Sequence, residues 1–187
     1  MKKLSKTMLA AIIIVIVTAA AFGVGLYLLL RDNEPYRDLF ENSQLKIKVN
    51  GEELGIYTAE ELAELSGIKE FSAVYKPSGK DPILRGYEGF ELKSVLAAAG
   101  IDISQIKSVS FRGLDGFTKG LFPLSDLHKD KEIFIAVKYA GKNFIRGVKP
   151  SCSAYPEEDG GPFVVIKASD AFSNNRIRGL AEINVTV

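Results

Sequence analysis

Apolar residues are spread unevenly along this chain, and their longest run lies near the N-terminus. The segment 9–30 has no charged residue and consists largely of Ala, Ile, Val, Leu and Phe. At about 1.5 Å of rise per residue, a helix of this length can cross a hydrocarbon core about 30 Å thick. The pattern therefore predicts one transmembrane helix over 9–30, preceded by a short tip at 1–8.

The charges on either side of this run predict its orientation. Three lysines stand before it, whereas Arg31 is followed closely by acidic residues. Because positive charge favours the cytoplasmic side of a membrane span, we expect the tip 1–8 in the cytoplasm and the rest of the chain outside it. The protein is thus predicted to be a single-pass protein of the cell membrane. The alternative is a cleavable signal peptide ending near 19–21, although signal peptides have a shorter apolar region of about 7–15 residues.

Beyond a polar stalk expected at 31–44, the chain shows alternating strand patterns. Apolar and polar residues alternate over 45–49, and Asn50-Gly51 follows, a dipeptide typical of tight hairpin turns. Further strands are predicted at 69–75, 107–112, 117–123, 132–138, 163–167 and 183–187. The region 147–162 is rich in Pro, Ser, Gly and acidic residues and is predicted to be a long loop.

Two short helices are predicted among these strands. Thr58 and Glu61 have the spacing of a capping box at the start of the first helix. The second is expected at about 91–99, where apolar residues recur every three or four positions and Gly100 ends the pattern. The extracytoplasmic part, 45–187, is therefore expected to be one α+β domain with strand-rich mixed sheets and short helices.

Composition and charge limit the classes of function. The 187 residues include 24 basic and 23 acidic side chains, one cysteine and no tryptophan. Subtracting the three lysines of the first thirty residues leaves 21 basic against 23 acidic side chains over 31–187. This balance excludes a broad nucleic-acid surface, so no nucleic-acid partner is expected. A single cysteine also excludes a disulfide framework.

Several motifs occur in an order that resembles the molybdopterin-binding domain of the sulfite oxidase family. The matching stretches are 86–100, 109–117, 133–141, 160–163 and 179–185. The resemblance implies the sulfite oxidase molybdopterin-domain fold, with a cleft that holds a molybdopterin cofactor. It also implies that one cysteine thiolate binds the molybdenum. The loop 76–81, which corresponds to the family's ligand loop, contains no cysteine.

Two groups of residues are candidates for binding the cofactor. Arg112, Asp115 and Gly116 surround a turn, and an Arg–Asp pair there would hold an oxyanion. The alternative is a plain hairpin turn, for which Asp-Gly is a common sequence. The second group is carried by the resemblance: Gly160 and Gly161 belong to its Gly-Gly-Pro motif, and Arg176 lies where a basic residue would meet a cofactor phosphate. Arginines in loops are also often simply solvated.

Cys152 is the only thiol and therefore the only candidate thiolate ligand for a metal. The alternatives are a cysteine without a role and one that pairs with a second molecule. The expected function is a membrane-anchored ligand-binding or accessory module that lacks the usual molybdenum-ligating cysteine, with a small molecule or pterin as ligand and a redox or accessory subunit as partner. One alternative is an active molybdenum-cofactor oxidoreductase that uses Cys152. Another is a structural cell-surface domain without a ligand.

Overall fold

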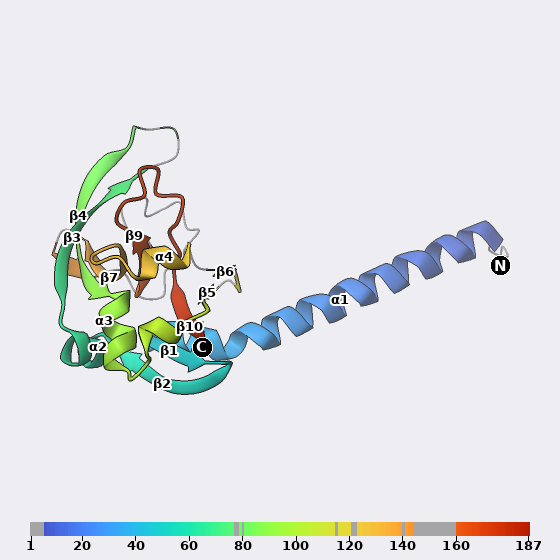
Figure 1. Ribbon diagram of the computed structural model, residues 1–187. Helices are drawn as coiled ribbons and strands as arrows, with labels where there is room; N and C mark the ends of the chain where they lie inside the picture. The colour runs from blue at the N-terminus through green and yellow to red at the C-terminus, as the bar shows by residue number, and fades with distance from the viewer. Residues whose placement is uncertain are drawn as a thin grey trace. The chain divides into compact units, whose positions relative to one another are not determined.

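The first helix, α1 (Lys6–Glu41), runs out of one compact unit of the chain, Met1–Pro35, and into a second, Tyr36–Val187 (Figure 1). The computed structural model describes residues 6–76, 79, 81–114, 116–120, 123–139, 141–143 and 160–187. The helix continues to Glu41 and so covers most of the stalk expected at 31–44. Tyr36 already belongs to the second unit, and Leu39 is buried there.

Within the apolar run, the structure describes the side chains of Met8 and of residues 12–28. The large apolar side chains that are exposed along this part of α1 are Met8, Ile12, Ile13, Ile14, Val15, Ile16, Val17, Phe22, Val24, Leu26, Tyr27 and Leu28. In the described part of the chain, no helix is both long enough and apolar enough to cross a membrane. The transmembrane helix predicted over 9–30 is therefore not confirmed.

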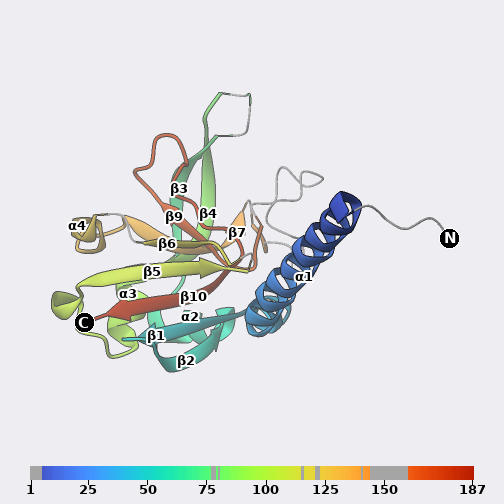
Figure 2. The ribbon, with the colours of Figure 1, turned by 90° about the vertical axis from the view of Figure 1, so that its right-hand side faces the viewer.

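One sheet of the second unit has five strands in the order β2-β1-β10-β5-β6. Its strands are β1 (Gln44–Val49), β2 (Glu52–Thr58), β5 (Ser108–Gly113), β6 (Thr118–Gly120) and β10 (Leu180–Thr186). β10 pairs with β1 in parallel and with β5 antiparallel. Figure 2 shows β5, β10, β1 and β2 side by side in this order. The last strand of the chain therefore lies in the middle of this sheet.

The other sheet follows the order β3-β4-β7-β8, and β9 also pairs with β7. Its strands are β3 (Lys69–Tyr75), β4 (Ile83–Glu91), β7 (Ile133–Tyr139), β8 (Lys142–Asn143) and β9 (Val164–Lys167). All its pairings are antiparallel. The sequence patterns did not predict β4, which supplies the partner for β3 and one of the partners for β7.

Short helices complete the fold. They are α2 (Ala59–Ser66), α3 (Leu92–Ala98), the 3-10 turn η1 (Ile103–Gln105) and α4 (Leu124–Leu127). The capping box at α2 is confirmed, since the Glu61 backbone N–H donates to the Thr58 side chain at 3.2 Å and Glu61 accepts from Thr58 at 2.7 Å. The Asn50-Gly51 hairpin is confirmed as well, with φ of 51° and 86°, as a primed turn requires.

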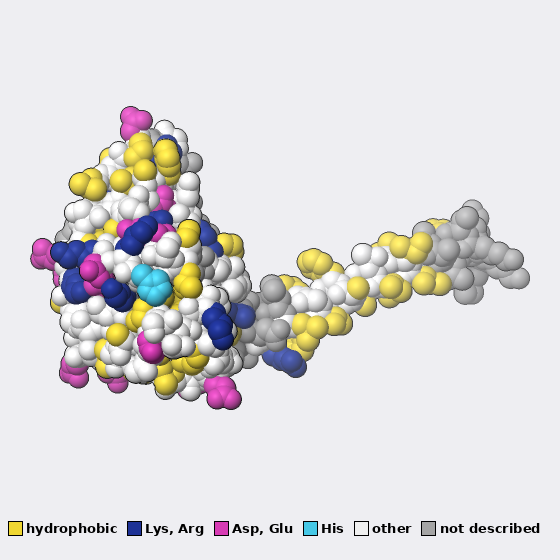
Figure 3. All heavy atoms as spheres, viewed as in Figure 1, with side chains coloured by type: hydrophobic (Ala, Val, Ile, Leu, Met, Phe, Trp, Pro, Cys, Tyr) yellow, Lys and Arg dark blue, Asp and Glu magenta, His cyan; other side chains and the backbone are white. Residues whose placement is uncertain are grey.

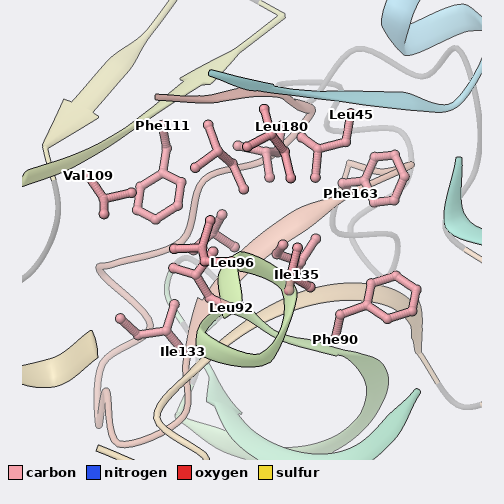
Figure 4. Close-up of a cluster of buried hydrophobic side chains, with 14 of the residues drawn as sticks. Leu45, Phe90, Leu92, Leu96, Val109, Phe111, Ile133, Ile135, Phe163 and Leu180 are labelled. Carbon is pink, nitrogen blue, oxygen red and sulfur yellow. The ribbon is translucent and has the colours of Figure 1, made fainter. Parts of the chain in front are cut away.

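The main core lies between the two sheets and includes one face of α3. Leu92 and Leu96 of α3 lie between Phe111 of the first sheet and Ile135 of the second, and all four are fully buried (Figure 4). Apolar burial of this kind supplies most of the stability of a small domain. The strand-rich α+β fold with short helices is thus confirmed.

Glycine is required at position 89 because the backbones of β4 and β7 approach each other closely there. A Cβ atom at this position would overlap the carbonyl oxygen of Ile135 and would lie 2.7 Å from the Cα of Ala136. Gly89→Ala is therefore expected to lower the free energy of unfolding by about 1–3 kcal/mol, as overpacking does. Chemical denaturation measures the change.

Gly86 offers a matched control on the same strand, because a Cβ there meets no atom within 4 Å. Gly86→Ala is expected to leave stability nearly unchanged. Equal losses in the two variants would show that the close approach of β4 and β7 does not require glycine.

Candidate functional site

The predicted site residues lie on several segments of the chain. Cys152 and Asp115 lie outside the described residues. Arg112 lies in β5, Gly116 lies in the turn between β5 and β6, and Arg176 lies in the segment that joins β9 to β10. Among the residues that are described, no three His, Cys, Asp or Glu side chains gather in a group that could hold a metal ion. The only histidine, His128, is exposed at the surface (Figure 3).

Arg112 contacts the last turns of α1. Its guanidinium carbon lies 4.1 Å from the ring centroid of Tyr36, which is within the range of a cation–π contact. The Tyr36 hydroxyl donates to Glu182 at 3.0 Å, and Glu182 pairs with Lys48 at 2.8 Å. The hydrogen bond to Glu182 raises the pKa of Lys48. Arg112 is thus part of a polar cluster that joins α1 to the first sheet.

The backbone brings three of the predicted positions close together. Gly160 and Gly161 are both buried, and the Gly160 carbonyl accepts a hydrogen bond from the N–H of Gly179 at 2.7 Å. The Gly179 carbonyl in turn accepts from the N–H of Leu114 at 2.9 Å. Gly116 lies two residues beyond Leu114, in the turn between β5 and β6, with φ of 78°. The Gly-Gly-Pro motif is therefore linked to this turn through Gly179.

A polar cleft of about 450 Å³ opens beside Arg176. The described residues that line it are Lys76, Gly79, Phe172, Ser173, Asn174, Arg176 and Arg178. Three of these described side chains are basic and none of them is acidic. A site of this composition suits an anion.

Hydrogen bonds to β3 hold the wall of this cleft in position. The Ser173 hydroxyl accepts from the N–H of Lys76 at 3.0 Å, and Nη2 of Arg176 donates to the carbonyl of Val74 at 3.0 Å. Within the wall, the carboxylate of Asp170 accepts from the N–H of Asn175 at 2.7 Å. These bonds place the Arg176 side chain against the second sheet instead of leaving it in solvent.

A buried carboxylate anchors the start of the same segment. Asp126, which is only 3% exposed, pairs with Lys129 and with Lys167, each at 2.6 Å. Hydrogen bonds from Lys129 and Lys167 hold the pKa of Asp126 below its usual value. Nearby, Ser169 donates a hydrogen bond to Glu132. The last residue of β9 and the beginning of the segment are therefore tied to α4 and β7.

Sequence reasoning missed a second arginine near Arg176. The guanidinium carbon of Arg85, on β4, lies 3.8 Å from the ring centroid of Tyr75 and 4.4 Å from that of Tyr139. The guanidinium carbon of Arg176 lies 5.4 Å from the same Tyr75 ring and 5.0 Å from the ring of Tyr87. Arg85 lies in a stretch without the alternating pattern of a strand, so the sequence did not indicate that it lies among these aromatic rings.

The shared ring limits the distance between the two cations. Since both are measured from the Tyr75 centroid, the two guanidinium carbons lie at most 9.2 Å apart, the sum of 3.8 and 5.4 Å. At an effective dielectric constant of about 20, unit charges at that distance repel by about 2 kcal/mol. An anion between them would reverse the sign of this interaction.

Comparisons with known proteins do not place the chain in a family. No family model matches the sequence, and no curated protein matches it either.

Asp126→Asn removes the charge of the buried carboxylate but keeps a side chain of the same shape. We expect the free energy of unfolding at pH 7 to fall by about 1–3 kcal/mol, the usual contribution of a charge-assisted hydrogen bond. Because the folded-state pKa of Asp126 lies below the ordinary value of an aspartate, this contribution is present above that ordinary value. It is lost as the pH falls through the folded pKa.

Denaturant unfolding of both proteins at pH 7 and near pH 3 measures the difference. Asp130→Asn is the control, because Asp130 also pairs with a lysine, Lys93, but is 83% exposed. The control is expected to change stability less. A difference between wild type and Asp126→Asn that stays constant with pH would contradict the assignment.

Proposed function

We propose that this protein is a membrane-anchored, extracytoplasmic domain that resembles the molybdopterin-binding domain of the sulfite oxidase family and acts as a ligand-binding or accessory module. The observation that carries the proposal is the basic cleft, which is lined by Lys76, Arg176 and Arg178. A ligand that carries a phosphate or another oxyanion is the chemical class that such a cleft recognises.

The positions of the matching motifs support the proposed relationship. The stretch 86–100 covers most of β4 and all of α3, and 133–141 covers β7 and the turn after it. The stretch 160–163 leads directly into β9, and 179–185 covers most of β10. These motifs thus lie on elements that build both sheets, as expected if they shape a common fold.

The donors in the cleft fit the anionic end of a pterin cofactor. Lys76, Arg176 and Arg178 are cationic donors of the kind that hold a phosphate, and Tyr75 and Tyr87 offer aromatic faces beside Arg176. A molybdopterin cofactor, when bound, supplies the sulfur ligands and the redox chemistry of its metal. This chain's own residues would bind and orient its phosphate.

The content of pterin and molybdenum in the purified full chain tests the proposal, after co-expression with the enzymes of cofactor synthesis. We expect pterin without stoichiometric molybdenum, and at least a tenfold loss of pterin in Arg176→Met. Fluorescence of the released pterin and mass spectrometry of the metal measure the two contents. Lys107→Met is the control, since it removes one positive charge from an exposed position just before β5, outside the cleft.

Other outcomes of this experiment favour the other functions. Stoichiometric molybdenum that disappears in Cys152→Ala would replace the module with an active oxidoreductase. A chain that carries neither pterin nor metal under these conditions would favour a structural cell-surface domain.

The membrane anchor is proposed from the sequence of 9–30, which has no charged residue. The exposed apolar side chains along residues 12–28 of α1 support it, because a row of such side chains is unfavourable in water. The lysines before the run support a cytoplasmic N-terminus.

Membrane fractionation and thiol labelling test the anchor and its orientation. The full chain is expected to stay with membranes after an alkaline carbonate wash, and a chain without residues 1–30 is expected to be released. In a Cys152→Ala background, a membrane-impermeant thiol reagent added to intact cells should label Lys107→Cys but not Ser5→Cys. Release of the full chain by carbonate, or the reverse labelling pattern, would contradict the proposal.

A further inference from the structure

Arg85 is a buried cation, and two of its three side-chain nitrogen atoms have no hydrogen-bond acceptor among the described residues. The residue is 8% exposed, and its Nε and Nη1 atoms are buried without a hydrogen-bond acceptor. These two nitrogens carry three of the five N–H donors of an arginine. Its guanidinium lies over the rings of Tyr75 and Tyr139. If Arg85 served only in packing, these buried donors would remain without acceptors, at a large cost in desolvation free energy.

The register of the second sheet explains why Arg85 faces the aromatic rings. Arg85 lies opposite Ala73, and Tyr87 lies opposite Phe71 on β3 and opposite Tyr139 on β7. Because cross-strand partners and alternate residues share one face, Arg85 and the tyrosines project from the same side of the sheet. The small side chain of Ala73 leaves space there for the guanidinium.

The aromatic contacts do not replace hydrogen bonds. A ring attracts a cation through its face, whereas the N–H donors of a guanidinium lie in the plane of that group and require acceptors in that plane. The donors of Arg85 are therefore still available to a ligand that brings oxygen atoms.

Arg176 approaches the same face from the segment between β9 and β10. Its guanidinium shares the Tyr75 ring with Arg85, and its bond to the Val74 carbonyl fixes its position. Arg176 also lines the basic cleft, and the Tyr75 ring that it shares with Arg85 keeps the two guanidinium carbons within 9.2 Å of each other.

We infer that Arg85 and Arg176 together form a binding site for a phosphate group, either as inorganic phosphate or as the phosphate of an ester. The inference deepens the proposed ligand-binding function and rests on it. A phosphate has several acceptor oxygens and up to two negative charges, which match two guanidinium groups held close together. A monocarboxylate has two oxygens and one charge, and so would leave one of the arginines uncompensated.

Isothermal titration calorimetry of the full chain in detergent micelles, at constant ionic strength, tests the site with inorganic phosphate and with phenyl phosphate. Both ligands are expected to bind the wild-type chain. Arg85→Met is expected to weaken binding at least tenfold, because it removes the buried donors. Arg85→Lys keeps the charge but loses the planar fork, and is expected to weaken binding severalfold.

Lys107→Met is the matched control, since it removes the same charge from an exposed side chain outside the cleft. It is expected to leave phosphate affinity unchanged. Tighter binding of phenyl phosphate than of inorganic phosphate would identify an ester as the ligand, and equal or weaker binding would identify free phosphate.

Thermal unfolding separates a binding role of Arg85 from a structural one. Phosphate is expected to raise the Tm of the wild-type chain and not that of Arg85→Met, and without phosphate the variant should be at least as stable as the wild type. A variant that binds phosphate as tightly as the wild type would overturn the inference, as would a wild-type chain that binds neither ligand. If Arg85→Met fails to fold, undiminished binding by Arg85→Lys has the same meaning.

The two proposals fail in distinguishable ways. Phosphate binding that depends on Arg85, in a chain that acquires no pterin, would leave the phosphate site standing and remove the cofactor. Pterin content without any binding of phosphate would do the reverse.

Discussion

The pairing of β10 between β1 and β5 is the constraint on which the rest of the domain depends. β10 bonds to β1 in parallel, with Ile47 opposite Ile183, although the two strands are far apart in the sequence. On its other side it bonds to β5, with Phe111 opposite the same Ile183. Without β10, the first sheet would separate into two hairpins that could not cover α3. The domain therefore requires its last strand before its core can close.

This constraint also builds the site. β9 belongs to the second sheet and β10 to the first, so the segment between them must cross from one sheet to the other. Its start is anchored by Lys167 on Asp126, and its middle is bonded to β3 through Ser173 and Arg176. The segment that crosses between the sheets thus places Arg176 against the aromatic face of the second sheet.

The proposed function follows from the kind of charge that this arrangement concentrates. Arg85 and Arg176 share one tyrosine ring, and Lys76 and Arg178 line the cleft beside it. Such a site attracts anions without any metal ligand, which agrees with the absence of a cysteine from the loop 76–81. A module with the proposed anion-binding cleft and without a thiolate in this loop would be suited to hold or present a ligand.

The sequence by itself determined the elements that depend on near neighbours. The Asn50-Gly51 turn, the capping box of Thr58 and Glu61, and the helix that ends before Gly100 were all predictable, since their geometry is decided within a few residues. The α+β class followed from the same local patterns.

Only the tertiary structure decided the partners of each strand and the neighbours of each charge. β4 was missed because Arg85, Gly86 and Gly89 interrupt the apolar alternation that marks a strand. Arg85 and Gly89 are explained only by contacts with other strands. Arg176 was found as a candidate through its place in the motif order, but nothing local linked it to Arg85. That link depends on strand register and on a chain crossing, and both are set by contacts between residues far apart in the sequence.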